Sequence, residues 1–313
     1  MNDDRHTPFG AVLLRWALMP LALMPGWLLY RCSDVLAFLL RHVVRYRRRL
    51  IIDNLAVSFP EKSEAERRDI LNGFYRNFAD YIVESIKLLH ISDEEMLQRF
   101  EFGNIGLLND LLGQRRTVIA YFSHCFNWEW APSVTLHFPE SVRSGVAFCQ
   151  IYRPLRNKIF DALMLHIRSR FGSLSIPKSR ALRYFVDFSR KGIPSVTGFM
   201  SDQKPSHGDT GHILQFLNRP TDVITGTETL ARRLDAAVIY WDMRKTSRGH
   251  YRIDIIPMAM HAAYTEPSQL TVSYYAMLEN SIRRDPTIWL WSHNRWKNAP
   301  KPKQNPEPCQ PAR

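Results

Sequence analysis

Short apolar runs alternate with stretches of helical periodicity along most of this chain, and this alternation limits the fold more than any other feature. The clearest run is TVIAYF at 117–122, which predicts a buried strand. Ser63 and Glu66 form a capping-box pattern at the start of a helix predicted over 61–90. Further strands are predicted at 142–149, 194–200, 213–217, 237–242 and 251–256, and further helices at 155–170, 227–234 and 269–284. The alternation predicts an α/β fold with a mainly parallel sheet flanked by helices.

The N-terminal segment predicts contact with a membrane. Residues 9–30 read FGAVLLRWALMPLALMPGWLLY, and Arg15 is their only charge. The uncharged stretch after Arg15 has 15 residues, fewer than the roughly 20 that cross a bilayer, and Pro20, Pro25 and Gly26 interrupt it. A cleaved signal peptide fits poorly, because no small-residue cleavage site follows.

The next segment predicts an interfacial helix capped by Ser33. Its apolar and arginine positions fall on separate helical faces, Leu36, Leu39, Leu40 and Val43 on one and Arg41, Arg45 and Arg48 on the other. This pattern is typical of a helix lying on anionic lipid, although an ordinary amphipathic helix on the domain surface has it too. Because the arginines follow the apolar run, the positive-inside rule places the rest of the chain in the cytoplasm.

The positive charge is concentrated in two short segments. The chain carries 42 Lys and Arg against 30 Asp and Glu, a net charge of +12. Residues 41–49 hold five arginines and residues 293–303 hold four Lys or Arg, with no acid in either segment. The remainder is nearly neutral. This distribution favours docking on an anionic membrane surface and argues against a nucleic-acid partner.

The ends of the chain suggest the domain organisation. We expect membrane-anchoring helices at 1–49, one α/β domain at 50–299 and a disordered tail at 300–313, where five of fourteen residues are proline. The four cysteines form no CxxC pair, which argues against a zinc ribbon or a redox dithiol. They are interpreted as free thiols of a reducing compartment.

A histidine and a carboxylate directly follow the predicted strand at 117–122. If a helix starts near Asn127, Glu129 lies in its first turn, where the helix dipole favours the ionised carboxylate. Glu129 could then reach back to one ring nitrogen of His124 and leave the other free as a base. The alternative is a polar strand end and a surface acid. A Cys125 nucleophile would point away from His124, and no HExxH pattern indicates a metal.

Two further strand ends carry polar residues. Arg153 lies in YRPLRNK after the second predicted strand, and Asp202 and Gln203 lie in SDQKP after the third. The carboxyl ends of parallel strands meet at one edge of a sheet, so these groups should converge there with His124.

The motifs resemble those of a known family. SHCFNWEW resembles the HX4D/E signature of acyltransferases, with Glu129 where many members have aspartate. YRPLRNKIFD, the SDQKP loop, FLNRPTDVITGTETLARRL and WLWSHNRWK resemble further blocks of the bacterial lipid A late acyltransferases, the lauroyl and myristoyl acyltransferases. The resemblance runs from the N-terminal segment to Lys297. The order and spacing of the blocks are more specific than the HX4E box alone.

This resemblance implies a fold like that of the glycerolipid acyltransferases and an enzyme at the cytoplasmic face of the bacterial inner membrane. Such an enzyme moves a fatty acyl chain from acyl carrier protein, or from coenzyme A, to a hydroxyl of a lipid A precursor. His124 and Glu129 match the catalytic dyad, and Arg153 matches a residue that holds phosphate or stabilises the oxyanion. We expect Asn127, Asp202 and Gln203 to bind substrate. No metal or other cofactor is expected.

Two alternatives stay open at this point. The acceptor could be a lysophospholipid or an aminolipid, because glycerophospholipid acyltransferases have a similar box. The chain could also be a membrane-associated protein that binds lipid or acyl carrier protein without turnover.

Overall fold

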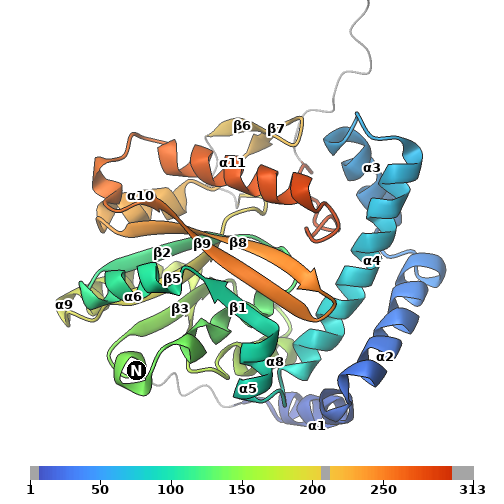
Figure 1. The fold of residues 1–313 in the computed structure, drawn as a ribbon, viewed down its shortest axis with the longest axis horizontal. Coiled ribbons are helices and arrows are strands. Elements are labelled where there is room, and N and C mark those ends of the chain that lie inside the picture. Colours follow the sequence, from blue (N-terminus) through green and yellow to red (C-terminus); the bar gives the residue numbers. More distant parts are fainter. Residues whose placement is uncertain (1–6, 206–211, 298–313) are drawn as a thin grey trace, which may run out of the picture.

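A seven-stranded sheet forms the centre of the molecule, with the strand order β1-β9-β8-β2-β5-β3-β4 (Figure 1). The computed structural model describes residues 7–205 and 212–297, so the predicted tail at 300–313 lies outside the described residues. The strands are β1 (Phe100–Gly103), β2 (Thr117–Phe122), β3 (Ala147–Tyr152), β4 (Leu174–Pro177), β5 (Ser195–Met200), β8 (Ala237–Ser247) and β9 (His250–Ala259).

Five neighbouring strands of this sheet are parallel, namely β8, β2, β5, β3 and β4. The hairpin partner β9 runs antiparallel to β8, and β1 pairs parallel with β9. The mainly parallel α/β sheet predicted from the alternation is therefore confirmed. In β2 every residue after Thr117 is buried, as expected for a central parallel strand that is covered on both faces.

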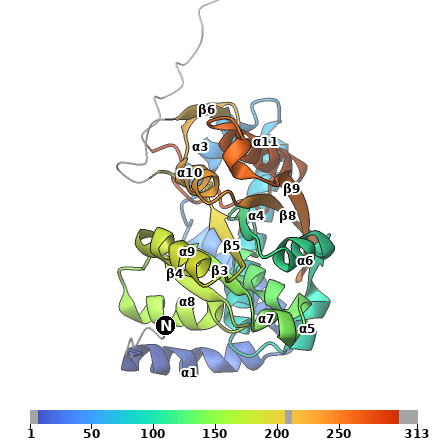
Figure 2. The same ribbon diagram turned by 90° about the vertical axis from the view of Figure 1, so that its left-hand side faces the viewer.

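Helices cover both faces and one end of the sheet (Figures 1 and 2). Those after the N-terminal region are α3 (Arg48–Ser58), α4 (Glu64–Lys87), α5 (Asp93–Arg99), α6 (Ile105–Gly113), α7 (Glu140–Arg143), α8 (Lys158–Arg168), α9 (Ala181–Arg190), α10 (Gly226–Arg233) and α11 (Gln269–Arg284), with 3₁₀ turns at η2 (Trp128–His137), η3 (Lys178–Arg180) and η4 (Ala262–Tyr264). The capping box at Ser63 is confirmed, since the Ser63 N–H donates to the Glu66 carboxylate and Ser63 Oγ accepts from the Glu66 N–H.

Some predicted boundaries differ from the structure. The second strand begins at Ala147 instead of residue 142, because the short helix α7 follows Pro139 and takes up the first residues of the predicted run. The run at 213–217 forms β6 (Ile213–Phe216), which pairs with β7 (Arg219–Asp222) in a hairpin outside the main sheet. The elements β1, β4, α5, α6 and α9 were not predicted. The strands β1 and β4 have four residues each and carry little periodicity, whereas α9 is strongly amphipathic and was overlooked.

The N-terminal region forms α1 (Phe9–Leu23), α2 (Gly26–Phe38) and the π-helical turn η1 (Leu39–Val43). Among the described helices none alone has the length and apolarity needed to cross a bilayer. By length and composition only, α1 taken together with α2 and η1 would meet the requirement, with a bend of 112° between them. The chain breaks at Pro25, which precedes the first residue of α2.

The predicted interfacial helix differs in two ways. Ser33 is not a helix cap: it lies inside α2, is fully buried and donates to Asp80 Oδ1 at 2.7 Å. Arg45 and Arg47 have positive φ angles, so the chain turns there and Arg41, Arg45 and Arg48 do not share one helical face. In the second basic segment Arg295 is buried and donates to the Asp222 carbonyl, so it adds no charge to the surface.

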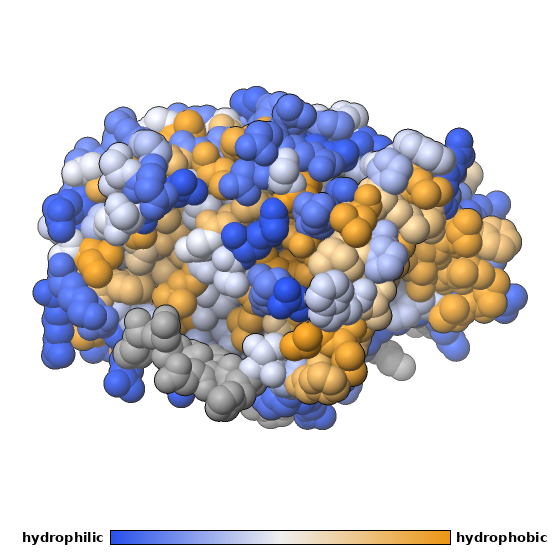
Figure 3. All heavy atoms as spheres, turned by 90° about the horizontal axis from the view of Figure 1, so that it is seen from below, coloured by the Kyte–Doolittle hydropathy of each residue, from blue (hydrophilic) through white to orange (hydrophobic). Residues whose placement is uncertain are grey.

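Large apolar side chains are exposed on this N-terminal region. Trp16 and Trp27 are each 70% exposed. The others on α1, α2 and the turn that follows are Phe9, Leu13, Leu23, Val35, Phe38, Leu39, Val43 and Val44. The helix α8, which lies beside α1, adds Ile159 and Phe160. Figure 3 shows the molecule from the side of α1, with hydrophobic surface gathered at its right-hand end, toward α2. Large exposed apolar areas are typical of interaction surfaces.

Candidate active site

His124 lies directly beyond the carboxyl end of β2, and its closest side-chain partner comes from the end of the neighbouring strand β5. His124 Nδ1 lies 2.7 Å from Asp202 Oδ1, and the backbone N–H of His124 donates to Asp202 Oδ2 at 3.1 Å. The parallel pairing of β2 with β5 brings the two residues together. Asp202 is 2% exposed, whereas the His124 ring is 14% exposed and lines a cavity.

The carboxylate of Asp202 is held in its ionised form. Burial by itself would raise its pKa, but the charge and hydrogen bonds of His124 and a hydrogen bond from Trp289 Nε1, at 2.9 Å, lower the pKa below its usual value. An ionised Asp202 accepts a hydrogen bond from His124 Nδ1, which therefore carries the proton of the neutral ring. This leaves Nε2 without a proton, so that its lone pair can accept one, as a general base requires.

The loop that carries Asp202 and Gln203 is held by the late segment of the chain. The Tyr275 hydroxyl donates to the Ser201 carbonyl at 2.8 Å, and His293 Nε2 accepts from the Lys204 N–H at 3.3 Å. Burial lowers the pKa of His293 to about 4, so its ring is neutral at physiological pH and can accept this bond. Gln203 Nε2 lies 3.0 Å from His124 Nε2, so the amide donates to the basic nitrogen.

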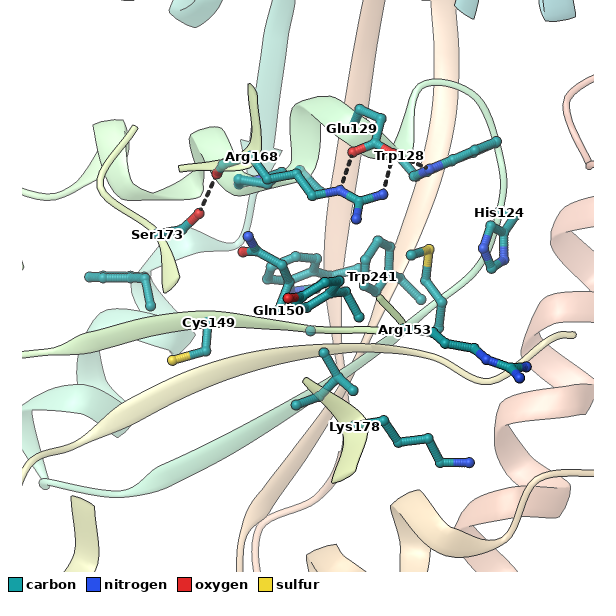
Figure 4. Close-up of a pocket in the computed structure, with 18 of the residues that line it drawn as sticks. His124, Trp128, Glu129, Cys149, Gln150, Arg153, Arg168, Ser173, Lys178 and Trp241 are labelled. Carbon is teal, nitrogen blue, oxygen red and sulfur yellow. Dashed lines mark hydrogen bonds and ion pairs between the residues drawn. The ribbon is translucent and has the colours of Figure 1, made fainter. Parts of the chain in front are cut away.

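Glu129 forms a buried ion pair with Arg168 instead of contacting His124 (Figure 4). Arg168 Nε donates to Glu129 Oε2 at 2.7 Å, and Arg168 Nη2 donates to Glu129 Oε1 at 2.6 Å. The prediction that Glu129 reaches a ring nitrogen of His124 is therefore wrong, because those nitrogens bond to Asp202 and Gln203. Trp128 lies between the two, packing edge-on against the His124 ring and donating from Nε1 to Glu129 Oε1 at 3.0 Å.

The ion pair keeps both of its members charged. Burial would raise the pKa of Glu129, which is 3% exposed, but the charge and hydrogen bonds of Arg168 lower it below the usual value. Burial would lower the pKa of Arg168, but Glu129 raises it. Two of the three guanidinium nitrogens face Glu129 in a bidentate pair, which orients the group firmly at the wall of the cavity.

Sequence reasoning missed Arg168. It is the last residue of α8 and lies 39 positions from Glu129. Nothing in its local sequence distinguishes it from the other arginines near that helix. Only the contact between α8 and η2 in three dimensions identifies it.

Asn127 has a different place from the one expected of a substrate-binding residue. Its side chain is completely buried and does not line the cavity. Its Oδ1 accepts from the Glu129 N–H at 3.2 Å, so Asn127 caps the turn η2, and its Nδ2 donates to Glu84 at 3.1 Å. A helical turn does start at Asn127, as the contact between Glu129 and His124 would have required, but the turn is 3₁₀ and not α. A role in binding substrate stays a prediction.

A cavity of about 570 Å³ lies along this edge of the sheet. It has the size of ordinary small-molecule sites. Figure 4 shows His124 and Arg153 at one end and Cys149 and Ser173 at the other, with Trp241 between them. Its walls include the apolar side chains Phe122, Ala131, Val134, Phe148, Val196 and Met200. The apolar part of the lining suits a hydrocarbon chain, and the charged groups, which include His124, Arg153 and the Glu129–Arg168 pair, could meet a polar head.

The three strand ends converge as predicted. His124 after β2, Arg153 after β3 and Gln203 after β5 all line this cavity. Arg153 is exposed at the mouth, where it could meet an anionic group. Cys125 is buried away from the cavity and bonds to Ser123, and burial raises the pKa of its thiol, so it is a poor nucleophile.

Comparison with known proteins gives a consistent result. The family model described as bacterial lipid A biosynthesis acyltransferase matches residues 5–298. A lipid A biosynthesis palmitoleoyltransferase of Escherichia coli (strain K12) is 24% identical over 83% of this chain and 82% of its own. A lipid A biosynthesis lauroyltransferase of the same organism is 22% identical over 89% of this chain and 88% of its own. A lipid A biosynthesis acyltransferase of Haemophilus influenzae is 21% identical over 88% of this chain and 83% of its own.

The match to the family model covers nearly the whole chain and includes the strand ends that form the cavity. The resemblance inferred from the HX4E box and the later blocks is confirmed. The chain is an acyltransferase and belongs to the bacterial lipid A biosynthesis acyltransferase family.

Proposed function

We propose that this protein transfers a fatty acyl chain from a thioester to a hydroxyl of a lipid A precursor, with His124 as the general base. The observation that carries the proposal is the contact of His124 Nδ1 with the buried carboxylate of Asp202, beside a largely apolar cavity. The names of the relatives, which cover lauroyl, myristoyl and palmitoleoyl transfer, support the acyl group and the acceptor.

The reaction follows from the protonation state of His124. The acceptor hydroxyl takes the place of the Gln203 amide at Nε2 and gives its proton to that nitrogen while its oxygen attacks the thioester carbonyl carbon. The tetrahedral intermediate then expels the thiolate, which takes the proton back from Nε2. Asp202 stabilises the imidazolium that exists between the two steps. Base catalysis of this kind contributes roughly 10²- to 10⁴-fold in rate.

Negative charge that builds on the carbonyl oxygen needs a fixed donor. Arg168 suits this role because Glu129 engages only its Nε and Nη2, which leaves Nη1 to face other groups. In this proposal Glu129 orients Arg168, and Asp202 takes over the orientation of His124 that the sequence had suggested for Glu129. Arg153 at the mouth would hold an anionic group of either substrate. Acyl carrier protein and coenzyme A are both anionic, and both are compatible with this mouth.

We further propose that α1, α2 and η1 rest on the cytoplasmic face of the bacterial inner membrane. The exposed apolar residues of these helices and of α8 support this placement. The arginines that follow η1 would face the anionic headgroups. In this position the cavity beside α8 would open close to the lipid surface.

Replacing Trp16 and Trp27 with glutamine is expected to weaken binding to vesicles that contain phosphatidylglycerol by tenfold or more. The reason is that burying a large apolar side chain contributes roughly 1.5–3 kcal/mol. Sedimentation with the vesicles measures the change. Surface substitutions test the anchor better than deletion of residues 1–49, because Ala22 and Leu29 are buried and deletion would disturb the fold. Tyr264→Gln, at a position 84% exposed on another surface, is the control. Equal binding by all variants would contradict the placement.

Mass spectrometry of lipids from cells with and without the gene tests the function directly. The gene is expected to add the mass of one fatty acyl chain to a lipid A species, and the increment gives the chain length. A shift in a phospholipid or an aminolipid instead would contradict the proposed acceptor. An unchanged lipid profile, together with no transfer by the purified protein, would contradict the proposed reaction.

A further inference from the structure

Glu84 of α4 is a buried carboxylate that the proposed reaction does not use. It is 1% exposed. Three neutral groups donate to it: the Tyr30 hydroxyl to Oε1 at 2.9 Å, and the Tyr251 hydroxyl and Asn127 Nδ2 to Oε2 at 2.8 Å and 3.1 Å. In the described part of the chain it forms no ion pair. Burial and the nearby charge of Asp80 raise the pKa of Glu84, while the hydrogen bonds from Tyr251, Asn127 and Tyr30 oppose this rise, so its position calls for an explanation.

The Glu84 carboxylate determines the direction of the Asn127 amide. An amide has one donating end and one accepting end, whereas both oxygens of Glu84 accept hydrogen bonds here. Glu84 therefore holds the NH₂ end of Asn127 and turns the oxygen toward the Glu129 N–H, which it caps at 3.2 Å. A second contact joins the same two elements, since Trp130 Nε1 donates to the backbone carbonyl of Glu84 at 3.3 Å.

These contacts form a continuous hydrogen-bonded path. It runs from Tyr30 on α2 through Glu84 and Asn127 to the backbone of Glu129, whose carboxylate holds Arg168. We infer that Glu84 is a positioning residue for acyl transfer: it orients the Asn127 amide and, through it, the Glu129–Arg168 pair, and Tyr30 ties this arrangement to the N-terminal helices. The inference rests on the proposed function, because it assumes that the Glu129–Arg168 pair serves the reaction.

Exchanging the hydrogen-bond donor and acceptor between Glu84 and Asn127 tests the inference. Asn127→Asp places two carboxylates against each other, so kcat is expected to fall at least tenfold at pH 8 with little change in KM. Glu84→Gln alone should stay within about threefold of wild type, because its oxygen can still accept from Asn127 and Tyr251 while its NH₂ donates to the Tyr30 oxygen. The double variant, Glu84→Gln with Asn127→Asp, should recover wild-type kcat, because the introduced glutamine amide can then donate to the introduced aspartate.

The pH profile separates positioning from a purely structural role. In Asn127→Asp one shared proton would restore a donor between the two carboxylates, so its kcat relative to wild type should rise as the pH is lowered. The double variant should follow the wild-type profile. Asn77→Asp is the matched control. Asn77 is a buried asparagine on α4, the helix that carries Glu84, but its amide bonds to Thr287 and Lys245. It should change stability, leave kcat unchanged and gain nothing from Glu84→Gln.

The assay uses full-length protein with lauroyl, myristoyl and palmitoleoyl thioesters of acyl carrier protein and of coenzyme A, and a lipid A precursor as acceptor. Wild-type kcat in Asn127→Asp, or a folded double variant with kcat still tenfold low, would overturn the inference. If Asn127→Asp does not fold, the kcat of the double variant alone decides whether the inference holds. His124→Ala in the same assay tests the proposed function. If this variant stays active, the proposed function fails. If it is inactive while Asn127→Asp is fully active, only the role of Glu84 is overturned.

Discussion

His124→Ala is expected to lower kcat for acyl transfer by roughly 10²- to 10⁴-fold while leaving the fold and membrane binding unchanged. The variant removes the only group in the proposed mechanism that takes the hydroxyl proton, and this range is the usual contribution of a general base. The His124 ring lies at the cavity surface and is 14% exposed, so its loss leaves no large internal void. Single-turnover transfer, thermal unfolding and vesicle sedimentation measure the three properties.

His261→Ala provides the control for this experiment. His261 also pairs with an aspartate, Asp235, at 2.8 Å, but it lies on the exposed surface outside the cavity. It should retain full activity. Asp202→Asn should also reduce kcat, since the introduced amide is uncharged and could no longer hold the Nδ1 proton as an anion does. Full transfer activity in His124→Ala would show that the proton is taken elsewhere.

Glu129→Ala is expected to destabilise the protein by about 3–5 kcal/mol, the usual cost of leaving one member of a buried ion pair alone. It should abolish transfer as well, because Arg168 would lose the partner that orients it. Removing both charges in Glu129→Ala with Arg168→Met should recover much of the stability but none of the activity. Urea unfolding of the single and double variants gives the two free energies. A single variant no less stable than the double would contradict this account.

The stability that Glu129 contributes is expected to depend on pH in one direction. The pKa of Glu129 is lowered in the folded protein, so the stabilisation is fully present above the unfolded value of about 4.3 and is lost as the pH falls through the folded pKa. The stability difference between wild type and Glu129→Ala should therefore be constant near neutral pH and shrink in acid. A difference that grew as the pH was lowered would argue against an ionised Glu129.

The sequence predicted the elements with strong local patterns and missed contacts between distant residues. The strand 117–122 and the helix 269–284 were predicted to the residue, because each is long or apolar enough to show its period. His124 was found because it follows a buried strand. Its partner Asp202 was expected at the site but not as its partner, since spacing along the chain tests only close neighbours. The parallel pairing of β2 with β5 joins residues 78 positions apart.

Residues 288–290 complete the site, although they lie far from His124 in the sequence. The Phe126 N–H donates to the Ile288 carbonyl, the Leu290 N–H donates to the His124 carbonyl, and Trp289 donates to Asp202. A nascent chain that has left the ribosome only as far as residue 280 already contains every residue expected at the site from its sequence, yet it lacks the segment that aligns them. The site is therefore expected to take its final geometry only after residues 288–290 have been synthesised and have packed against the loop that carries His124.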